Sequence, residues 1–179
     1  MAGCMAEKIT GSTWESLMQK RIFKPLGMES AGFGPPGFPG KTDQPWGHGR
    51  SGKTWNPRQF DNAQALGPAG RVHCTVEDWA KFLAIQLPGG NKLGLNRKTL
   101  NKLITPYGNY AGGWNVSKRP WGKGTVLMHT GSNTRWYALV WVAPEINRAF
   151  LVVTNSRDNH SHPICDQIIG KLIGINQGK

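Results

Sequence analysis

GTVLMHTGSNTRWYALVWVAPEINRAFLVVT, residues 124–154, is the stretch that decides the fold class. Apolar and aromatic side chains alternate with others over 124–129, 135–142 and 149–154, and this period of two predicts strands. Short connections join these strands, which indicates antiparallel neighbours. With a further strand predicted over 110–116, the sequence indicates an antiparallel sheet of about four strands.

The N-terminal residues predict a helix in two pieces. Apolar residues recur at helical spacing over 2–22, and Gly11, flanked by polar residues, interrupts the pattern. Ser12 followed by Glu15 has the spacing of a capping box, which would begin the second piece.

Two further helices are expected before the strands and one after them. Thr75 and Asn96 favour the N-cap position, and an apolar face follows each of them. Residues 163–173 predict a final helix that covers the sheet. We expect its buried stripe to consist of Ile164, Ile168, Ile169, Leu172 and Ile173. Helices, then strands, then a covering helix are typical of an α+β domain.

The 179 residues fit a single domain of ordinary size. Glycine and proline are frequent after residue 28 and no periodicity survives there, which predicts a long loop that is functional or lies against a partner. Within the single domain 1–179 we expect a helical part over 1–27, a long irregular loop over 28–74, a helical part over 75–106, antiparallel strands over 107–155 and a C-terminal helix over 160–175.

The composition excludes a disordered or membrane-spanning chain. Hydrophobic residues make up 38% and charged residues 18% of the sequence. The longest apolar run, residues 137–144, is much shorter than a bilayer span. The first eight residues lack the pattern of a signal peptide, so the sequence as written predicts a cytoplasmic location. Three widely spaced cysteines do not suggest a disulfide framework.

The formal charge of +12 attracts polyanions, so nucleic acid has to be considered as a partner. Basic residues interleave with aromatic ones in one region, as in single-strand binders. The residues concerned are Lys92, Arg97, Lys98, Lys102, Tyr107, Trp114, Lys118, Arg119, Trp121 and Lys123. We favour a solvated basic face with the tryptophans turned inward, because no nucleic-acid-binding signature accompanies the run.

Residues 47–54, GHGRSGKT, match the phosphate-binding loop pattern letter for letter. That loop needs a buried strand before it and a helix after it, because the helix N-terminus supplies the fixed N–H groups. Here Pro57 disfavours helical geometry at Asn56. We interpret the match as a coincidence in a glycine-rich segment.

Two groups of potential metal ligands also occur. His160, His162 and Cys165 are close in sequence, as are His73 and Cys74, but neither group has the paired spacing of zinc sites. We therefore expect no metal ion and no cofactor.

The most informative element is His129-Thr130-Gly131-Ser132-Asn133, which ends one of the predicted strands. Gly131 allows a ligand to approach the backbone closely. The Ser132 N–H is then available as an oxyanion donor, and His129 and Thr130 are candidates to hold a substrate.

Seven stretches of the chain occur in an order that is found in a known family. They are residues 6–11 (AEKITG), 22–28 (IFKPLGM), 44–48 (QPWGH), 67–72 (GPAGRV), 78–82 (DWAKF), 110–114 (YAGGW) and 129–133 (HTGSN). From end to end the chain resembles the C-terminal part of the serine β-lactamase and penicillin-binding-protein-like hydrolases, especially class C-like enzymes and related esterases. The resemblance implies a partial β-lactamase-like (DD-peptidase-like) fold.

By that resemblance, residues 129–131 stand in the Lys-Thr-Gly box of the family, with His129 in place of lysine. Ser132 would contribute an oxyanion N–H, and Thr130 would help to hold the substrate. The family nucleophile belongs to a Ser-x-x-Lys box and is assisted by a Tyr-x-Asn box. No serine of this chain has lysine three residues later. Residues 107–109 fit Tyr-x-Asn, but their place in the chain is wrong for the catalytic box, so we interpret them as a turn.

A hydroxyl without an adjacent base is a poor nucleophile. The sequence therefore predicts a truncated, serine-hydrolase-like protein that carries one wall of an amide or ester hydrolase site and is inactive or nearly so alone. Small amides, esters or β-lactams are its expected ligands. The family's first strands are also missing, so an exposed sheet edge is expected to pair with another copy or with the absent N-terminal half. A non-catalytic interaction module is the main alternative, and a nucleic-acid or nucleotide binder is a further one.

Overall fold

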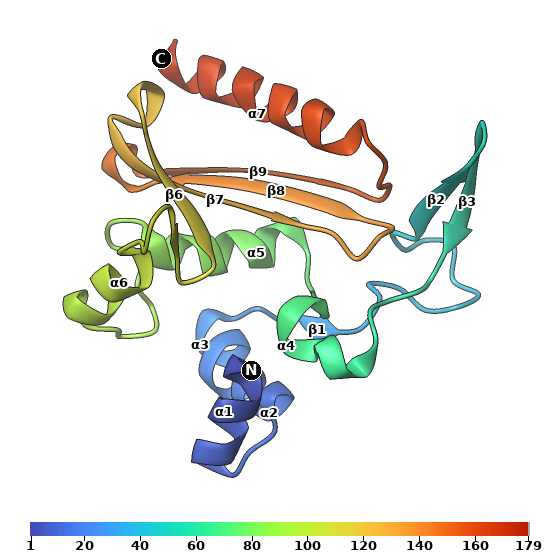
Figure 1. Cartoon of the computed structure of the whole chain (residues 1–179), viewed down its shortest axis with the longest axis horizontal. Helices are drawn as coiled ribbons and strands as arrows, with labels where there is room; N and C mark the ends of the chain where they lie inside the picture. The colour runs from blue at the N-terminus through green and yellow to red at the C-terminus, as the bar shows by residue number, and fades with distance from the viewer. Residues whose placement is uncertain (179) are drawn as a thin grey trace.

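A five-stranded antiparallel sheet forms the centre of the molecule (Figure 1). The computed structural model describes residues 1–178. Strands that are neighbours in the sheet are also neighbours in sequence, in the order β5-β6-β7-β8-β9. Their bounds are Tyr110–Ala111 (β5), Trp114–Arg119 (β6), Gly124–Gly131 (β7), Tyr137–Ala143 (β8) and Arg148–Thr154 (β9). The predicted antiparallel sheet is confirmed, but the single strand expected over 110–116 is two strands, β5 and β6, separated by a turn at Gly112 and Gly113.

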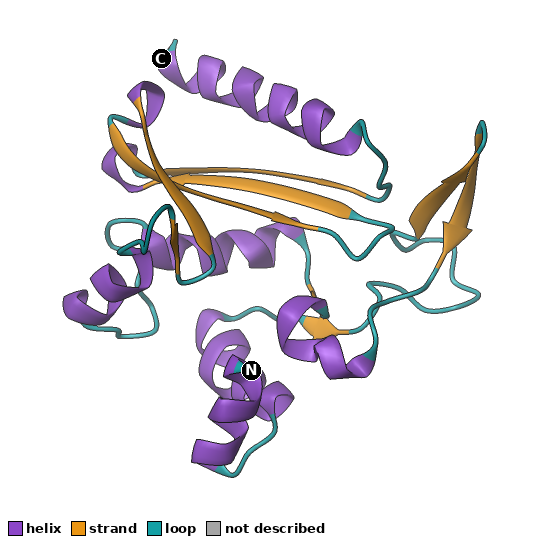
Figure 2. Ribbon diagram, viewed as in Figure 1, coloured by secondary structure: helices purple, strands orange, loops and turns teal. Residues whose placement is uncertain are grey.

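Helices cover both faces of this sheet (Figure 2). On one face α5 (Val76–Leu83) closes a cluster of Leu83, Trp114, Leu127, Val140 and Val142. On the other face α7 (Ser161–Gln177) closes a cluster of Tyr137, Leu139, Phe150, Cys165 and Ile169. Because both of its faces are covered, β8 is an almost continuous apolar run, YALVWVA.

The N-terminal part is helical, as predicted. It contains α1 (Ala2–Thr10), α2 (Trp14–Met18), a π-helical turn (Gln19–Phe23) and α3 (Lys24–Leu26). The break falls at Gly11, whose φ of 66° lies in the left-handed region. The predicted capping box is wrong: the Thr13 hydroxyl, not that of Ser12, accepts a hydrogen bond from the N–H of Ser16 at 3.2 Å. Glu7 accepts from the N–H of Trp14 at 2.8 Å, and α2 begins at Trp14, one residue later than a cap at Ser12 would place it.

Residues 28–74 are more regular than predicted. They contain β1 (Gly32–Phe33), β2 (Gly47–Ser51), β3 (Thr54–Arg58), a 3-10 turn (Gln64–Leu66), α4 (Gly67–Gly70) and β4 (Val72–His73). β1 pairs with β4, and β2 with β3 as a hairpin that extends away from the central sheet (Figure 1). Most of the hairpin side chains are exposed, so no alternation of apolar residues marks its strands in the sequence.

The two predicted N-caps between the loop and the sheet are confirmed. Thr75 accepts a hydrogen bond from the N–H of Asp78 at 3.3 Å and begins α5. Asn96 accepts from the N–H of Thr99 at 2.8 Å and begins α6 (Arg97–Ile104). A 3-10 turn (Ala84–Gln86) follows α5, and two more (Pro120–Gly122 and Pro144–Ile146) connect strands.

Asp78 on α5 holds the end of the N-terminal helical part against that helix. Its buried carboxylate accepts a hydrogen bond from the N–H of Ser30 at 2.7 Å and pairs with Lys81 at 2.6 Å. The hydrogen bonds from Lys81 and Ser30 lower the pKa of Asp78 to about 2. Lys81 also donates to the carbonyl of Gly27, so one ion pair holds the end of α3 against α5.

The predicted buried stripe of the last helix is partly wrong. Ser161, Cys165 and Ile169 are the buried residues of α7, whereas Ile164, Ile168 and Leu172 are exposed. The helix lies over β8 and the edge strand β9, so only one side of it rests on the sheet. Within residues 1–178 we find no helix with both the length and the apolar composition that a bilayer crossing requires.

Candidate active-site wall

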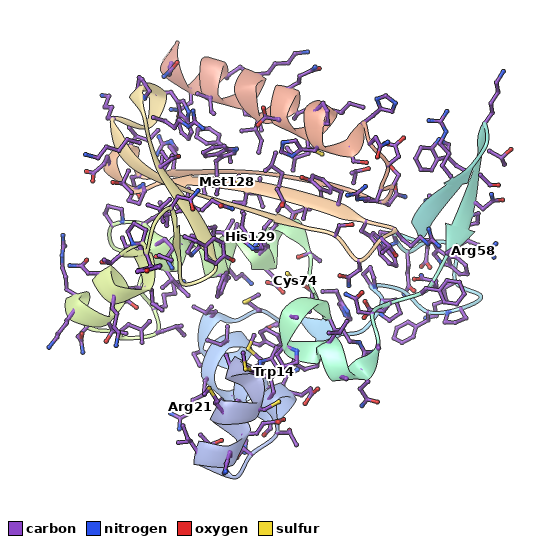
Figure 3. The ribbon with its side chains drawn as sticks, viewed as in Figure 1. Trp14, Arg21, Arg58, Cys74, Met128 and His129 are labelled. Atoms are coloured by element: carbon purple, nitrogen blue, oxygen red, sulfur yellow. The ribbon has the colours of Figure 1, made fainter. Side chains whose placement is uncertain are left out.

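His129, Thr130 and Gly131 are the last three residues of β7, an inner strand that pairs with β6 and β8. Strand geometry sends His129 to the α5 side of the sheet and Thr130 to the α7 side. The His129 ring packs edge-on against Trp114, with 6.4 Å between ring centroids, and the residue is otherwise exposed. His129 is labelled near α5 in Figure 3.

The imidazole of His129 is uncharged near neutral pH. Partial burial lowers its pKa from the ordinary value, because the charged form loses hydration against the sheet. A neutral ring both donates and accepts a hydrogen bond, whereas a lysine at this position would present only a cation. His129 is therefore suited to orient a polar group or to accept a proton.

Thr130 is connected to α7 through two aromatic residues. Burial raises the pKa of Tyr137, and a hydrogen bond with the Thr130 side chain partly opposes that effect. The Tyr137 hydroxyl lies 2.7 Å from Nδ1 of His162 in a hydrogen bond. Tyr137 of β8 is thus tied to α7 on the covered face of the sheet, the face toward which Thr130 points.

The turn after β7 is open on one side and strained. Apart from Gly131 and its two chain neighbours, no described residue has an atom within 4 Å of the position that a Cβ on Gly131 would take, so there is open space beside this residue. The hydroxyl of Ser132 accepts a hydrogen bond from the N–H of Thr134 at 3.1 Å. Thr134 itself has a φ of 65°, a conformation that β-branched residues rarely adopt. Strain of this kind is common where a binding site fixes the backbone.

A buried polar cluster anchors Asn133. Its amide donates to the carboxylate of Asp61, and its carbonyl oxygen accepts from Asn62 at 2.9 Å. Asp61 pairs with Arg71 at 3.1 Å, and its side chain is only 4% exposed. Asn62 also donates to the carbonyl of Gly70 at 3.1 Å. Three distant segments are joined at this point, which fixes the turn that carries Ser132.

Sequence reasoning missed Asp61 and Asn62. Both lie in the segment that was expected to be irregular, and nothing in their spacing marks them as partners of Asn133. The available signal was the nearby stretch 67–72, GPAGRV, which carries Gly70 and Arg71.

The segment that matches the phosphate-binding loop forms the β2–β3 hairpin instead. Gly52 has a φ of 58° in its tight turn, and Lys53 is exposed beside it. Residues 54–58 continue as a strand, so no helix N-terminus faces the turn. Residues 107–109 form a turn, as predicted, with Gly108 at a φ of 64°.

The residues weighed as metal ligands have protein partners. His162 contacts Tyr137, and Nδ1 of His73 lies 2.9 Å from the carbonyl oxygen of Gly34. Burial raises the pKa of the Cys74 thiol to about 11. Within residues 1–178, no three acidic, histidine or cysteine side chains come together as metal ligands.

The aromatic residues of the basic run divide between core and surface. Trp114 is buried, and Trp121 packs edge-on against Trp141 and Phe150. Tyr107 is almost fully exposed. The inward direction of the two tryptophans removes them from the surface that single-stranded nucleic acid would need.

Solved structures share this architecture. The chain superposes on D-amino acid amidase from Ochrobactrum anthropi SV3 with a TM-score of 0.77 and 18% identity, over 99% of this chain and 55% of that one. For the octameric penicillin-binding protein homologue from Pyrococcus abyssi the TM-score is 0.74 at 21% identity, over 96% and 40%. For the penicillin-binding protein from Bacillus halodurans it is 0.71 at 20% identity, over 87% and 49%.

In each case the chain spans less than two thirds of the length of the structure that it resembles. A comparison with curated protein sequences gives no match. The family model described as Beta-lactamase matches residues 1–172, which is almost the whole chain. The fold, the position of residues 129–133 at the end of an inner strand and this match together show that the chain belongs to the beta-lactamase family.

Proposed function

We propose that this chain forms one wall of the active site of a serine amide or ester hydrolase. The observation that carries the proposal is the end of β7, where Gly131 borders open space and a buried cluster fixes the turn that follows. Small amides, esters and β-lactams are the substrates that such a wall would serve. The β-lactamase fold and family support this chemistry at the level of the family.

Each residue of the wall has a proposed role. The N–H of Ser132 donates to the oxyanion that develops on the substrate carbonyl, since a preformed donor stabilises charge that appears in the transition state. Thr130 and the uncharged His129 hold polar groups of the substrate on the two sides of the strand. Asn133 makes no proposed contact with the substrate, and its two hydrogen bonds keep the Ser132 backbone in place.

The nucleophile and its base are proposed to come from a segment outside these residues. No serine of the chain is followed by lysine at the third position, and nucleophile and base act as a unit. We therefore propose that residues 1–179 alone bind substrate-like molecules weakly and turn them over very slowly or not at all. The amidases and penicillin-binding proteins that share the fold are about twice as long, which supports a missing catalytic portion.

Binding to the wall is the direct test. The probe is D-phenylalanine amide, chosen because D-amino acid amidase shares the fold. In a titration followed by ¹H–¹⁵N NMR we expect shifts confined to amides 129–134, with a Kd on the order of 1 mM, because donors without a nucleophile give little affinity. Thr130→Val should raise that Kd several-fold. Thr125→Val makes the same change at the start of the same strand and should leave the Kd unchanged.

Turnover assays complete the test. Micromolar protein with nitrocefin or p-nitrophenyl acetate should show no hydrolysis that a serine-directed fluorophosphonate abolishes, and mass spectrometry should show no adduct. Absence of chemical-shift changes at residues 129–134 would refute the proposal that these residues form a wall of the active site. A stoichiometric acyl or phosphonyl adduct on the protein would refute the proposal that the nucleophile lies outside these residues.

An interaction module is the second candidate function, and the uncovered edge of the sheet favours it. β9 is the last strand of the sheet in the described chain, and apolar residues of α7 are exposed. Pairing with an absent N-terminal half or with another copy would cover this edge. Nucleic-acid binding has only the net charge of +12 in its favour, and a steep fall of affinity with salt would be its signature.

A further inference from the structure

Thr130 and Tyr137 point to the same face of the sheet, the one that α7 covers. In the register of β7 and β8, Thr130 lies opposite Leu139, so these two side chains share a face. Tyr137 precedes Leu139 by two residues and therefore points the same way, on the diagonal from Thr130. Leu139 and Tyr137 both belong to the core cluster that α7 closes. Thr130 is half-buried, at the open end of β7.

The Tyr137 hydroxyl has a hydrogen-bond partner on each side. It lies 2.7 Å from Nδ1 of His162 in α7, and the two rings meet edge-on with 6.1 Å between their centroids. Its second partner is the Thr130 side chain: burial raises the pKa of Tyr137, and the hydrogen bond with Thr130 opposes that rise. Tyr137 is only 7% exposed, so one sheltered oxygen connects Thr130 with His162. We call these three side chains the Thr130–Tyr137–His162 relay.

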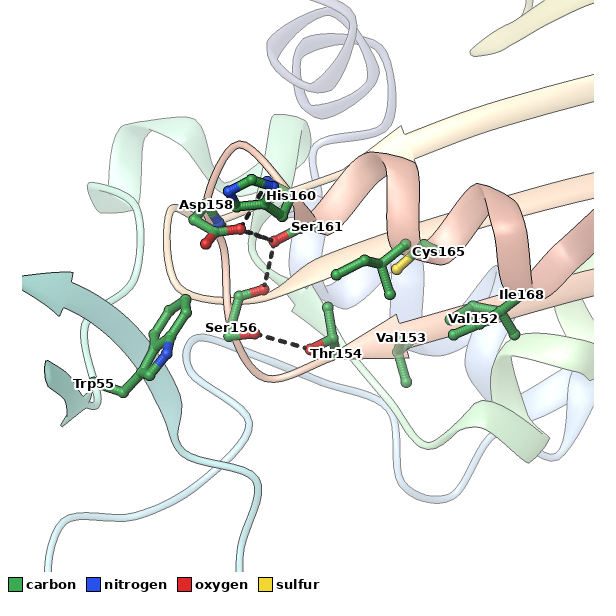
Figure 4. A pocket seen from close by; sticks show the side chains of 11 residues that line it. Trp55, Val152, Val153, Thr154, Ser156, Asp158, His160, Ser161, Cys165 and Ile168 are labelled. Atoms are coloured by element: carbon green, nitrogen blue, oxygen red, sulfur yellow. Dashed lines mark hydrogen bonds between the residues drawn. The ribbon is translucent and has the colours of Figure 1, made fainter. Parts of the chain in front are cut away.

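The start of α7 keeps His162 in place. The Ser161 hydroxyl accepts a hydrogen bond from the N–H of Asp158 at 2.9 Å and donates to the carboxylate of the same residue at 3.3 Å (Figure 4). Ser161 is buried, and Cys165, one turn further along, packs in the same core cluster as Tyr137. Because His162 follows Ser161 directly, its backbone cannot move away from Tyr137 without breaking these contacts.

The two hydrogen bonds of Tyr137 depend on each other, because a tyrosine hydroxyl has only one proton. If Nδ1 of His162 accepts that proton, the Tyr137 oxygen accepts the proton of Thr130. Thr130 then offers only lone pairs to a ligand. If Nδ1 carries a proton, it donates to Tyr137, Tyr137 donates to Thr130, and the Thr130 proton is free for a ligand.

We propose that Tyr137 and His162 are positioning residues that decide whether Thr130 accepts or donates a hydrogen bond in the candidate site. This inference rests on the proposed function, in which residues 129–133 bind substrate. Histidine ordinarily takes up its second proton between about pH 5 and 8, and both ring nitrogens are then donors. Protonation of His162 therefore fixes Thr130 in its donating state. A carboxylate, which only accepts, is then bound better at low pH, whereas a carboxamide can match either state.

Other titratable and charged groups surround the relay, and the test has to separate them from it. On the α7 side they are Arg157, Asp158, His160, Cys165 and Asp166. His129 points to the opposite face of β7, and its protonation would also attract a carboxylate. A substitution that removes only the Tyr137 hydroxyl keeps all of these groups and breaks the relay.

Two probes that differ in one group supply the test. N-acetyl-D-phenylalanine has a carboxylate and N-acetyl-D-phenylalanine amide has a carboxamide, and acetylation removes the amine that would otherwise titrate. In ¹H–¹⁵N NMR titrations of the full chain, followed at residues 129–134, the Kd of the carboxylate probe should fall about three- to tenfold from pH 8 to pH 5.5, as expected for one hydrogen bond. The Kd of the carboxamide probe should change less than about twofold.

Tyr137→Phe should have an effect that loss of structure would not produce. Without the phenol oxygen Thr130 is free to donate at every pH, so the carboxylate probe should bind to this variant several-fold more tightly than to wild type at pH 8. The pH dependence that remains belongs to His129. His162→Gln, which cannot titrate, should also reduce the pH dependence. His160→Gln is the matched control, because His160 lies beside Asp158 at the same helix start (Figure 4) and should leave the dependence unchanged.

A measurement without ligand separates the relay from the proposed function. The ¹³Cζ resonance of Tyr137 reports the hydrogen bonds of its hydroxyl and should follow the protonation of the His162 ring. Thr130→Val should displace this resonance, whereas Thr125→Val at the start of β7 should not. Near-ultraviolet circular dichroism shows whether each variant is folded.

The outcomes distinguish the two proposals. A ¹³Cζ resonance that responds to neither His162 nor Thr130 overturns the relay, whatever the probes do. Binding at residues 129–134 with the same pH dependence in Tyr137→Phe as in wild type overturns the role of Tyr137 and leaves the proposed function intact. Failure of both probes to bind at any pH overturns the proposed function and, with it, the role of the relay in binding.

Discussion

The end of β7 and the outer side of β9 belong to the same sheet, but their residues differ in polarity and in hydrogen bonding. After β7 the chain leaves the sheet through polar residues, of which Asn133 is held by Asp61 and Asn62, and Asp61 in turn by Arg71. At β9, the last strand of the sheet within residues 1–178, it presents apolar residues. Anchoring of a polar turn inside one chain is typical of a site that has to keep its shape. An apolar surface left open is typical of an interface.

The largest effect is expected from a substitution that removes core packing under the strand that carries residues 129–131. Leu127 is fully buried on β7, two residues before His129, so Leu127→Ala leaves a cavity and should lower the free energy of unfolding by about 2–5 kcal/mol. Val153→Ala on the exposed edge should change it by no more than about 0.5 kcal/mol. Urea unfolding followed by tryptophan fluorescence measures both. Equal losses of unfolding free energy in the two variants would show that Val153 is packed as closely as Leu127 is.

Asp61→Asn tests the polar anchor. The substitution keeps the shape of the side chain but removes the charged acceptor of Asn133 and Arg71, and should cost about 1–3 kcal/mol of stability. Hydrogen exchange of the amides of Ser132 and Thr134 should become faster. Asp43→Asn, at an exposed carboxylate, is the control and should change neither quantity. Unchanged exchange in Asp61→Asn would show that the cluster does not hold the turn.

Thr134→Gly tests whether the backbone of the turn after β7 is strained. Thr134 has a φ of 65°, which glycine adopts without a steric penalty. Release of that strain, less the entropy that glycine adds to the unfolded chain, should stabilise the protein by up to about 1 kcal/mol. Thr125→Gly, inside β7, should destabilise the protein. A lower melting temperature for Thr134→Gly would contradict the strain.

The smallest effect concerns pH. The folded protein lowers the pKa of His129, so below pH about 6.5 the unfolded state takes up a proton more readily than the folded state does. Stability therefore falls as the pH falls through that range. His129→Asn should reduce the drop in melting temperature between pH 7.5 and 5.5 by a small amount, because one side of the ring is exposed. Calorimetry at several pH values measures the slope, and a steeper slope in the variant would contradict the assignment.

Local sequence rules predicted the elements that bury one clear face. The strands around residues 124–154 and the caps at Thr75 and Asn96 follow from spacing and residue type alone. The rules failed at the β2–β3 hairpin, whose side chains are mostly exposed and show no pattern. They also failed for α7. Ile164 and Ile168 have the helical spacing of buried residues, but they are exposed, because only one side of the helix rests on the sheet.

By itself the sequence determined the antiparallel sheet, its covering helices, the candidate residues 129–133 and the lack of a Ser-x-x-Lys box, because each is written in neighbouring residues. Only the tertiary structure decided which residues hold Asn133, since Asp61 and Asn62 meet it across about seventy positions of chain. It also decided that β9 is the last strand of the sheet within residues 1–178 and that α7 lies over β8 and β9. Such facts depend on the order of strands in space, and no local pattern of side chains encodes that order.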